Sequence, residues 1–221
     1  MLARALLYML CRVNFNVGAF MKNIRKLFAA SIFSALAFAP VASAGVINGS
    51  FEDNIQANGT WSIYQNLVGW SGGQAGIELR NNVAGQAYDG VNYIELDTTA
   101  NSIASQAVTT LGQLYTLTFA YSPRMNVASG SNGIQVFWNG NSVGTFTGNG
   151  AGAGGNNWVL FSVDVMGTSP TSSLMFKAVG TSDSYGGSLD AVTLTAIPEP
   201  GTLALLGIGL VGLGLSRRRK S

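Results

Sequence analysis

The chain has 221 residues and no histidine, and its single cysteine is Cys11. Without histidine, the commonest general base and zinc ligand are missing, and Ser-His and Cys-His catalytic pairs are excluded. The formal net charge is +2, but residues 45–196 carry three basic and nine acidic side chains, a balance of −6. Phosphate backbones repel a domain of that charge, so nucleic acid is not an expected partner.

The N-terminal segment has the layout of a secretion signal. Its parts are, in order, three basic residues, an apolar run and a small-residue cleavage site: Lys22, Arg25 and Lys26, then Leu27–Val41, then Ala42-Ser43-Ala44. This order predicts removal by signal peptidase and a mature chain that begins at Gly45. We interpret residues 1–20 as an upstream extension, either an artefact of translation before Met21 or a long n-region. An uncleaved anchor is the alternative, and the apolar run is short for a membrane span.

Residues 45–196 read as β structure throughout, because short alternating runs are separated by clusters of Gly, Asn, Ser and Asp. The expected strands, in chain order, are Val46–Phe51, Gly76–Leu79, Asn92–Leu96, Ser102–Val108, Leu114–Tyr121, Ile134–Trp138, Ser142–Phe146, Val159–Val165, Leu174–Val179 and Ser188–Thr195. The Asn139-Gly140 pair predicts a type I′ hairpin turn. The stretch from Trp61 to Trp70 reads as loop-rich, and Gly148–Gly155 as a flexible loop tip.

About ten short strands without a helical period predict an all-β protein, a two-sheet antiparallel jelly-roll sandwich. A signal-peptide helix and a C-terminal apolar sorting helix are expected to flank it. The expected organisation is therefore an extension with a cleaved signal peptide at 1–44, the sandwich at 45–196 and a sorting segment at 197–221.

The C-terminal segment begins with Pro198-Glu199-Pro200, which cannot continue a central strand. An apolar stretch, Thr202–Leu215, follows, and then Arg217, Arg218, Arg219 and Lys220. The basic cluster is expected to stay cytoplasmic, which leaves the domain outside. The stretch is shorter than the ~18 apolar residues usual for a lasting span, so a transient hold on the inner membrane is expected.

This order of Pro-Glu-Pro, apolar stretch and terminal arginines resembles the PEP-CTERM sorting signal. The resemblance implies recognition by an exosortase-type transpeptidase, cleavage near Pro198–Pro200, and transfer to the cell surface or release. It also implies an association with exopolysaccharide.

Three motifs in the domain resemble galactose-binding-like sandwiches, a group that includes many carbohydrate-binding modules. They are Val46-Ile47-Asn48-Gly49-Ser50-Phe51-Glu52, Gly90-Val91-Asn92-Tyr93-Ile94-Glu95-Leu96-Asp97 and Leu189-Asp190-Ala191-Val192-Thr193-Leu194. The resemblance implies a jelly roll, frequently a structural calcium ion, and glycan binding in some members.

Aromatic side chains are the candidates for stacking on a sugar, because a ring offers apolar area and a negative face to pyranose C–H bonds. The candidates are Trp61, Tyr64, Trp70, Tyr88, Trp138, Trp158 and Tyr185. Trp138 is in phase with Ile134 and Val136, which assigns it to the core. Trp158 is out of phase with its strand, and Trp61, Tyr64 and Trp70 lie in the loop-rich stretch, so these four are the expected ligand contacts.

A glycoside-active enzyme is the second interpretation, because the domain has several carboxylates. Glycoside hydrolysis needs two of them on either side of one cleft. Glu78 and Glu95 alternate with apolar neighbours, as outward-facing strand residues do. Arg124 ends an apolar strand and is expected either to pair with a carboxylate or to donate to sugar hydroxyls. A non-catalytic glycan-binding module is therefore the leading interpretation, and a purely structural or adhesive matrix protein is the third.

A structural calcium ion is expected between Glu52 and Asp190. Asp190 is in phase with Val192 and Leu194, so its carboxylate should be buried and needs a partner. The first and last strands of a sandwich are often neighbours, which would bring Glu52 close. Oxygen ligands suit calcium, and capping of backbone amides by Asp190 is the alternative.

Overall fold

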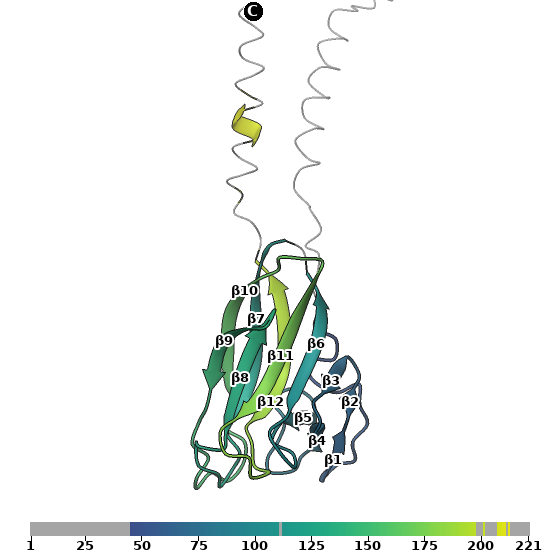
Figure 1. Ribbon diagram of the computed structural model, residues 1–221, viewed down its shortest axis with the longest axis vertical. Coiled ribbons are helices and arrows are strands. Elements are labelled where there is room, and N and C mark those ends of the chain that lie inside the picture. The colour runs from purple at the N-terminus through teal and green to yellow at the C-terminus, as the bar shows by residue number, and fades with distance from the viewer. Residues whose placement is uncertain (1–44, 111, 198–200, 202–206, 211, 213–221) are drawn as a thin grey trace, which may run out of the picture. The chain divides into compact units, whose positions relative to one another are not determined.

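Two six-stranded sheets make up the fold in the computed structural model, which describes residues 45–110, 112–197, 201, 207–210 and 212 (Figure 1). The strands are β1 Thr60–Tyr64, β2 Asn66–Leu67, β3 Trp70–Gly72, β4 Ile77–Asn81, β5 Asn92–Glu95, β6 Ile103–Thr109, β7 Leu114–Ser122, β8 Gly133–Trp138, β9 Asn141–Phe146, β10 Val159–Met166, β11 Thr171–Val179 and β12 Ser188–Ala196. One sheet has the order β1-β4-β5-β12-β7-β10 and the other β2-β3-β6-β11-β8-β9. Neighbouring strands run antiparallel, as β12 and β7 do, so the two-sheet antiparallel sandwich is confirmed.

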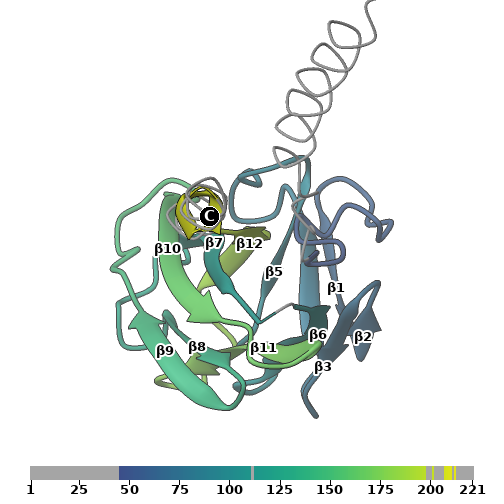
Figure 2. The same ribbon diagram turned by 90° about the horizontal axis from the view of Figure 1, so that it is seen from above.

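The core lies between the two layers, which Figure 2 shows from above. Strand β7 illustrates the alternation, because Tyr115, Leu117, Phe119 and Tyr121 are all buried in this core. Trp138 belongs to it too, as its phase predicted. The buried core residues lie between Phe51 and Ala196, so this segment carries its own core and should fold as a unit.

The β8–β9 hairpin confirms the prediction from Asn139-Gly140. Trp138 pairs with Asn141 across the turn, and Asn139 and Gly140 both have positive φ, 51° and 79°. Two positive φ values in a row define the type I′ turn, whose twist matches that of the flanking strands.

The expected strand Val46–Phe51 is wrong, because this segment forms turns and bends. Asn48 and Phe51 take left-handed φ values of 51° and 61°, which an extended strand does not allow. The segment packs on β12, where Val192 N donates to Gly49 O at 2.9 Å beside a register shift between Asp190 and Thr193. A Cβ on Gly49 would lie 1.9 Å from Val192 O, so this close approach requires glycine.

The stretch from Trp61 to Trp70, expected to be loop-rich, contains strands β1, β2 and β3 instead. Strand β1 was missed because it is only five residues long and its apolar side chains face solvent instead of the core. Ser62 pairs with core-facing Leu79, so Trp61 and Ile63 point away from the core and are exposed. Residues 60–63 do alternate between polar and apolar side chains, but the run is short and its apolar face is the outer one.

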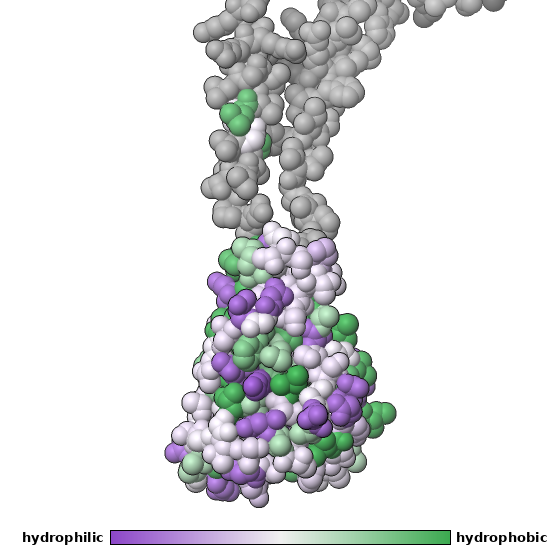
Figure 3. All heavy atoms as spheres, in the orientation of Figure 1, coloured by the Kyte–Doolittle hydropathy of each residue, from purple (hydrophilic) through white to green (hydrophobic). Residues whose placement is uncertain are grey.

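The ends of the chain are described only in part. Residues 207–210 and 212 are helical, and among the described residues no helix is long and apolar enough to cross a membrane. The signal peptide of 1–44 and the sorting residues Pro198, Glu199, Pro200, Arg217, Arg218 and Arg219 lie outside the described residues. On the face of the sandwich that Figure 3 presents, apolar side chains occur in small groups among polar ones, as is usual for a solvated surface.

Candidate functional site

A row of charged side chains lies on the outer face of the β1–β10 sheet, the face turned away from the core. In β4, Ile77 and Leu79 belong to the core, so Glu78 and Arg80 point to the outer face. Glu78 is the register partner of Glu95 on β5. Two carboxylates therefore face each other across neighbouring strands, an arrangement that needs a counter-ion.

Two arginines supply the counter-ions. Glu78 Oε1 accepts from Arg80 Nε at 2.6 Å and lies 2.5 Å from Arg80 Nη2. The same Nη2 lies 3.1 Å from Glu95 Oε2, which also accepts from Arg124 Nη1 at 2.7 Å. The second oxygen of Glu95 accepts from Gly186 N at 2.8 Å. We call Glu78, Arg80, Glu95 and Arg124 the charged floor; its formal charge is zero.

Burial controls the electrostatics of this floor. Glu78, Arg80 and Glu95 are buried, and 16% of the Arg124 side chain is exposed. Loss of solvation raises the pKa of Glu95 to about 7, although Arg80, Arg124 and the Gly186 amide each lower it. The floor is thus a nearly dry, compensated network whose outermost member is Arg124.

A cavity of about 300 Å³ lies above this floor, and we call it the Trp61 cavity. Its lining residues are Trp61, Ile63, Glu78, Arg80, Thr98, Thr99, Arg124, Ser184 and Tyr185. Two aromatic rings from different elements face solvent here, Trp61 of β1 at 53% exposed and Tyr185 of the β11–β12 loop at 49%. The Arg124 guanidinium lies 5.0 Å from the centre of the Tyr185 ring, within cation–π range.

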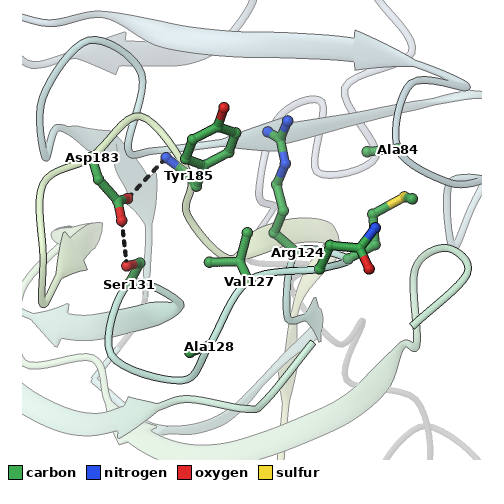
Figure 4. Close-up of a pocket in the computed structure, with 9 residues that line it drawn as sticks. Ala84, Arg124, Val127, Ala128, Ser131, Asp183 and Tyr185 are labelled. Carbon is green, nitrogen blue, oxygen red and sulfur yellow. Dashed lines mark hydrogen bonds between the residues drawn. The ribbon is translucent and has the colours of Figure 1, made fainter. Parts of the chain in front are cut away.

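A second cavity of about 670 Å³, the Ala128 cavity, adjoins the first (Figure 4). Its lining residues are Ala84, Arg124, Met125, Asn126, Val127, Ala128, Ser131, Asp183 and Tyr185. Arg124 and Tyr185 belong to both cavities. Asp183 accepts from Ser131 Oγ at 2.7 Å and from Tyr185 N at 3.2 Å, which fixes the loop that carries Tyr185.

Three lining residues have left-handed backbones that are uncommon outside glycine. Ala84 has φ 61°, Asn126 has φ 62° and Ser184 has φ 68°. Such conformations are costly and tend to cluster at functional sites. These are three of the eight non-glycine residues with positive φ in the described chain.

Trp61 and Arg124 are the two expected ligand contacts that the structure brings together, in the Trp61 cavity. For Arg124, the expected ion pair is present, with Glu95 as the partner. Tyr64 is half-buried, packs against the core and donates its hydroxyl to Gln56 Oε1 at 3.0 Å. It does not line either cavity.

The structure contradicts the prediction that Trp70 contacts a ligand. Its ring is 2% exposed and packs against Phe51 and Phe176, with centroid separations of 5.6 and 6.1 Å. Its Nε1 donates to Asn48 O at 3.0 Å. A ring enclosed in the core cannot stack on a sugar.

Trp158 is partly buried and lies against a different set of aromatic rings. Its ring meets Tyr93 edge to face at 5.6 Å and Tyr88 at 6.3 Å, and its Nε1 donates to Gln86 O at 2.9 Å. The indole donor is therefore engaged within the domain. Trp158 lines neither cavity.

The carboxylates of Glu52 and Asp190 bind successive amides of one loop. Asp190 Oδ2 accepts from Tyr88 N and Asp89 N, and its Oδ1 accepts from Ala191 N. Glu52 Oε1 accepts from the amides of residues 91 and 92 at 2.8 and 2.7 Å. Burial raises the pKa of Asp190 to about 7, and the amides lower it. The buried carboxylate thus has partners without a cation.

Calcium at this pair stays a prediction. In the described ranges, no three His, Cys, Asp or Glu side chains gather as a metal centre would need. A calcium ion held by Glu52 and Asp190 would have to take most of its six to eight oxygens from backbone carbonyls and water.

Sequence reasoning missed Arg80 and Asp183, and it treated Glu78 and Glu95 as ordinary solvent-facing residues. The spacing Glu78-Leu79-Arg80 was the available signal, because alternation puts the acid and the base on one face of a strand. Asp183 lies in a loop, where no periodicity marks it. Tyr185 was among the aromatic candidates, and the structure places it at the junction of the two cavities.

Residues 196–220 match the family model of the PEP-CTERM protein-sorting motif. The match identifies the chain as an exported protein with a C-terminal sorting signal of this kind, as its Pro-Glu-Pro and terminal arginines predicted. None of the curated proteins matches the chain.

Solved structures with a similar fold include three small β domains. A family 35 carbohydrate binding module from Clostridium thermocellum is 15% identical, with 61% of this chain and 97% of that chain covered and a TM-score of 0.43. TmCBM61, solved with β-1,4-galactotriose, is 16% identical over 70% and 100% of the two chains, also at 0.43. The K2 cleaved adhesin domain of Lys-gingipain is 14% identical over 71% and 99%, at 0.50. At such identities a likeness concerns the fold and leaves the ligand open.

Proposed function

We propose that the exported domain is a non-catalytic glycan-binding module and that sugar binds in the Trp61 cavity. The observation that carries this proposal is the pairing of two solvent-facing rings, Trp61 and Tyr185, with a floor of charged hydrogen-bonding groups. Aromatic faces meet the apolar C–H surface of a pyranose, and a few fixed polar groups hold its hydroxyls.

The sorting motif supports a setting for this activity. After processing by signal peptidase and an exosortase-type transpeptidase, the protein would reach the cell surface or the surrounding matrix, and the resemblance of its tail to the PEP-CTERM signal implies an association with exopolysaccharide. We therefore propose exopolysaccharide as the partner and transient anchoring in the inner membrane before release.

The charged floor gives less support to the alternative that the domain is a glycoside-active enzyme. Glu95 is 0% exposed, and both of its oxygens are engaged, one by two arginines and the other by the Gly186 amide. A catalytic carboxyl must reach the glycosidic bond or its water. Glu78 and Glu95 hold Arg80 and Arg124 in place instead, which suits recognition.

Glycan-array binding of residues 45–197, followed by calorimetry on the glycan that binds, tests the proposal. Trp61→Ala and Tyr185→Ala should each lose about 1–3 kcal/mol of binding free energy, the range of a good aromatic contact. Tyr88→Ala is the control, because Tyr88 is 48% exposed but lines neither cavity. No binding on a broad array would favour the structural matrix alternative, and release of new reducing ends would establish an enzyme.

A further inference from the structure

We infer that the ligand is an uncharged polysaccharide bound along its length, with consecutive sugars in the Trp61 and Ala128 cavities. This inference rests on the proposed function and deepens it. It concerns the size and the charge of the glycan, neither of which the exposed rings determine.

The continuity of the two cavities argues for several sugars. Arg124 and Tyr185 line both, so a ligand that meets Tyr185 in one cavity reaches the entrance of the other. Figure 4 shows Arg124 and Tyr185 side by side, with Asp183 beyond Tyr185 and Ala84 beyond Arg124. The Trp61 cavity, about 300 Å³, is at the lower limit of ordinary ligand sites, and the Ala128 cavity, about 670 Å³, is more than twice as large. A single ring would leave most of this space to water.

The lining of the Ala128 cavity suits a sugar as well. Met125, Val127 and Ala128 offer apolar surface to C–H groups, and Asn126, Ser131 and Asp183 carry donors and acceptors for hydroxyls. Tyr185 supplies an aromatic ring at its boundary with the first cavity. This mixture continues the character of the Trp61 cavity.

Charge compensation argues for an uncharged glycan. Glu78 and Glu95 neutralise Arg80 and Arg124, and the Ala128 cavity adds the carboxylate of Asp183. Lys177, the remaining basic residue between 45 and 196, lines neither cavity. A uronic acid or a sulfated sugar would therefore find no uncompensated cation, in a domain whose charge is already −6.

Donors for hydroxyl groups remain on this compensated floor. Arg80 is buried beside Tyr93; burial raises the pKa of that hydroxyl and Arg80 lowers it through its charge and a hydrogen bond, so the more accessible donors are those of Arg124. Arg124 contacts Glu95 through Nη1. Its remaining guanidinium nitrogens can donate to sugar hydroxyls, because 16% of the Arg124 side chain is exposed.

Calorimetry of residues 45–197 with two oligomer series tests the inference. The uncharged probes are β-1,4-linked glucose, galactose and mannose oligomers of one to six sugars, and the acidic probes are α-1,4-galacturonate oligomers of the same lengths. For an uncharged series that binds, we expect the affinity to rise at least about tenfold between one and five sugars, which is about 1.4 kcal/mol. The acidic series should bind at least about tenfold more weakly at each length.

Two variants on one loop locate the added sugars. Ala128→Trp should fill the Ala128 cavity and lower the affinity for long oligomers to that of the wild type for a single sugar. The fold should tolerate the change, because Ala128 is exposed. Ser129→Trp is the matched control, since Ser129 is exposed on the same loop but lines neither cavity.

The other possible outcomes would overturn either this inference alone or the proposed function with it. An affinity that stops rising after one sugar but still depends on Trp61 would overturn this inference and leave the proposed function standing. Tighter binding of the galacturonate series, or an unchanged length dependence in Ala128→Trp, would overturn it as well. If neither series binds and a broad array is also blank, the proposed function falls and this inference with it.

Discussion

Replacing Arg80 by methionine should destabilise the domain in a pH-dependent way. Methionine keeps much of the length and apolar volume but leaves the paired carboxylates of Glu78 and Glu95 without the guanidinium that joins them. Removing one partner of a buried ion pair costs about 3–5 kcal/mol, because an uncompensated charge stays in the interior. Arg124 remains bound to Glu95, so the loss at pH 8 should lie near the lower end of that range.

The sign of the pH dependence follows from the raised pKa of Glu95. A carboxyl whose folded-state pKa exceeds its unfolded value favours the folded state at low pH, and this contribution disappears as the pH rises through the folded-state value. With a shift from 4.5 to about 7, the wild-type domain should lose up to about 3 kcal/mol between pH 4 and pH 8 from this group. Without Arg80 the pKa of Glu95 should rise further, so the variant should lose more over the same interval.

Urea unfolding of residues 45–197 at pH 4 and pH 8 measures these differences. The difference in unfolding free energy between wild type and Arg80→Met should be largest at pH 8 and should narrow at pH 4, where Glu95 is protonated. Lys177→Met is the control, because Lys177 is exposed on the other sheet and should change little at either pH. Equal losses at both pH values would show that Arg80 acts through packing and would refute the electrostatic reasoning.

Two further predictions concern calcium and processing. If Glu52 and Asp190 hold calcium, EDTA should lower the thermal midpoint of residues 45–197 through linkage, and Asp190→Asn should abolish the difference. An unchanged midpoint, together with no metal in the purified domain, would leave the amide caps as the whole role of Asp190. In a host with an active exosortase, intact mass should show a surface protein without the leader and without residues after about Pro200. A full arginine tail on that mature protein would contradict sorting.

Alternation predicted the two-sheet fold well, because most strands bury one face and expose the other. It failed where a strand departs from that rule. Trp61 and Ile63 point outward on an edge strand, so β1 read as a loop, and the turns at Asn48 and Phe51 depend on contacts with β12 that lie far away in sequence. Glu78 and Glu95 were placed on the correct face, but their burial depends on loops that no local pattern describes.

The candidate site was less predictable for the same reason. Arg124 comes from the β7–β8 loop, and Asp183 and Tyr185 come from the β11–β12 loop. These two loops reach Glu95 only because the sheet order places β12 between β5 and β7. A sequence pattern gives residue types and faces, whereas this site is defined by which loops close over which strands.

The two ends of β12 separate the candidate site from the sorting signal. Ser188 at its start pairs with Glu95 and Ser122, beside the charged floor, while Ala196 at its end pairs with Tyr115. The nine residues of β12 are separated by eight steps of about 3.3 Å, which puts about 26 Å between its ends. The chain therefore leaves toward residue 197 at the end of the sandwich opposite to Arg124 and Tyr185. The match to the sorting motif begins at residue 196, so its start lies at the end of the domain away from the cavities in which we propose that sugar binds.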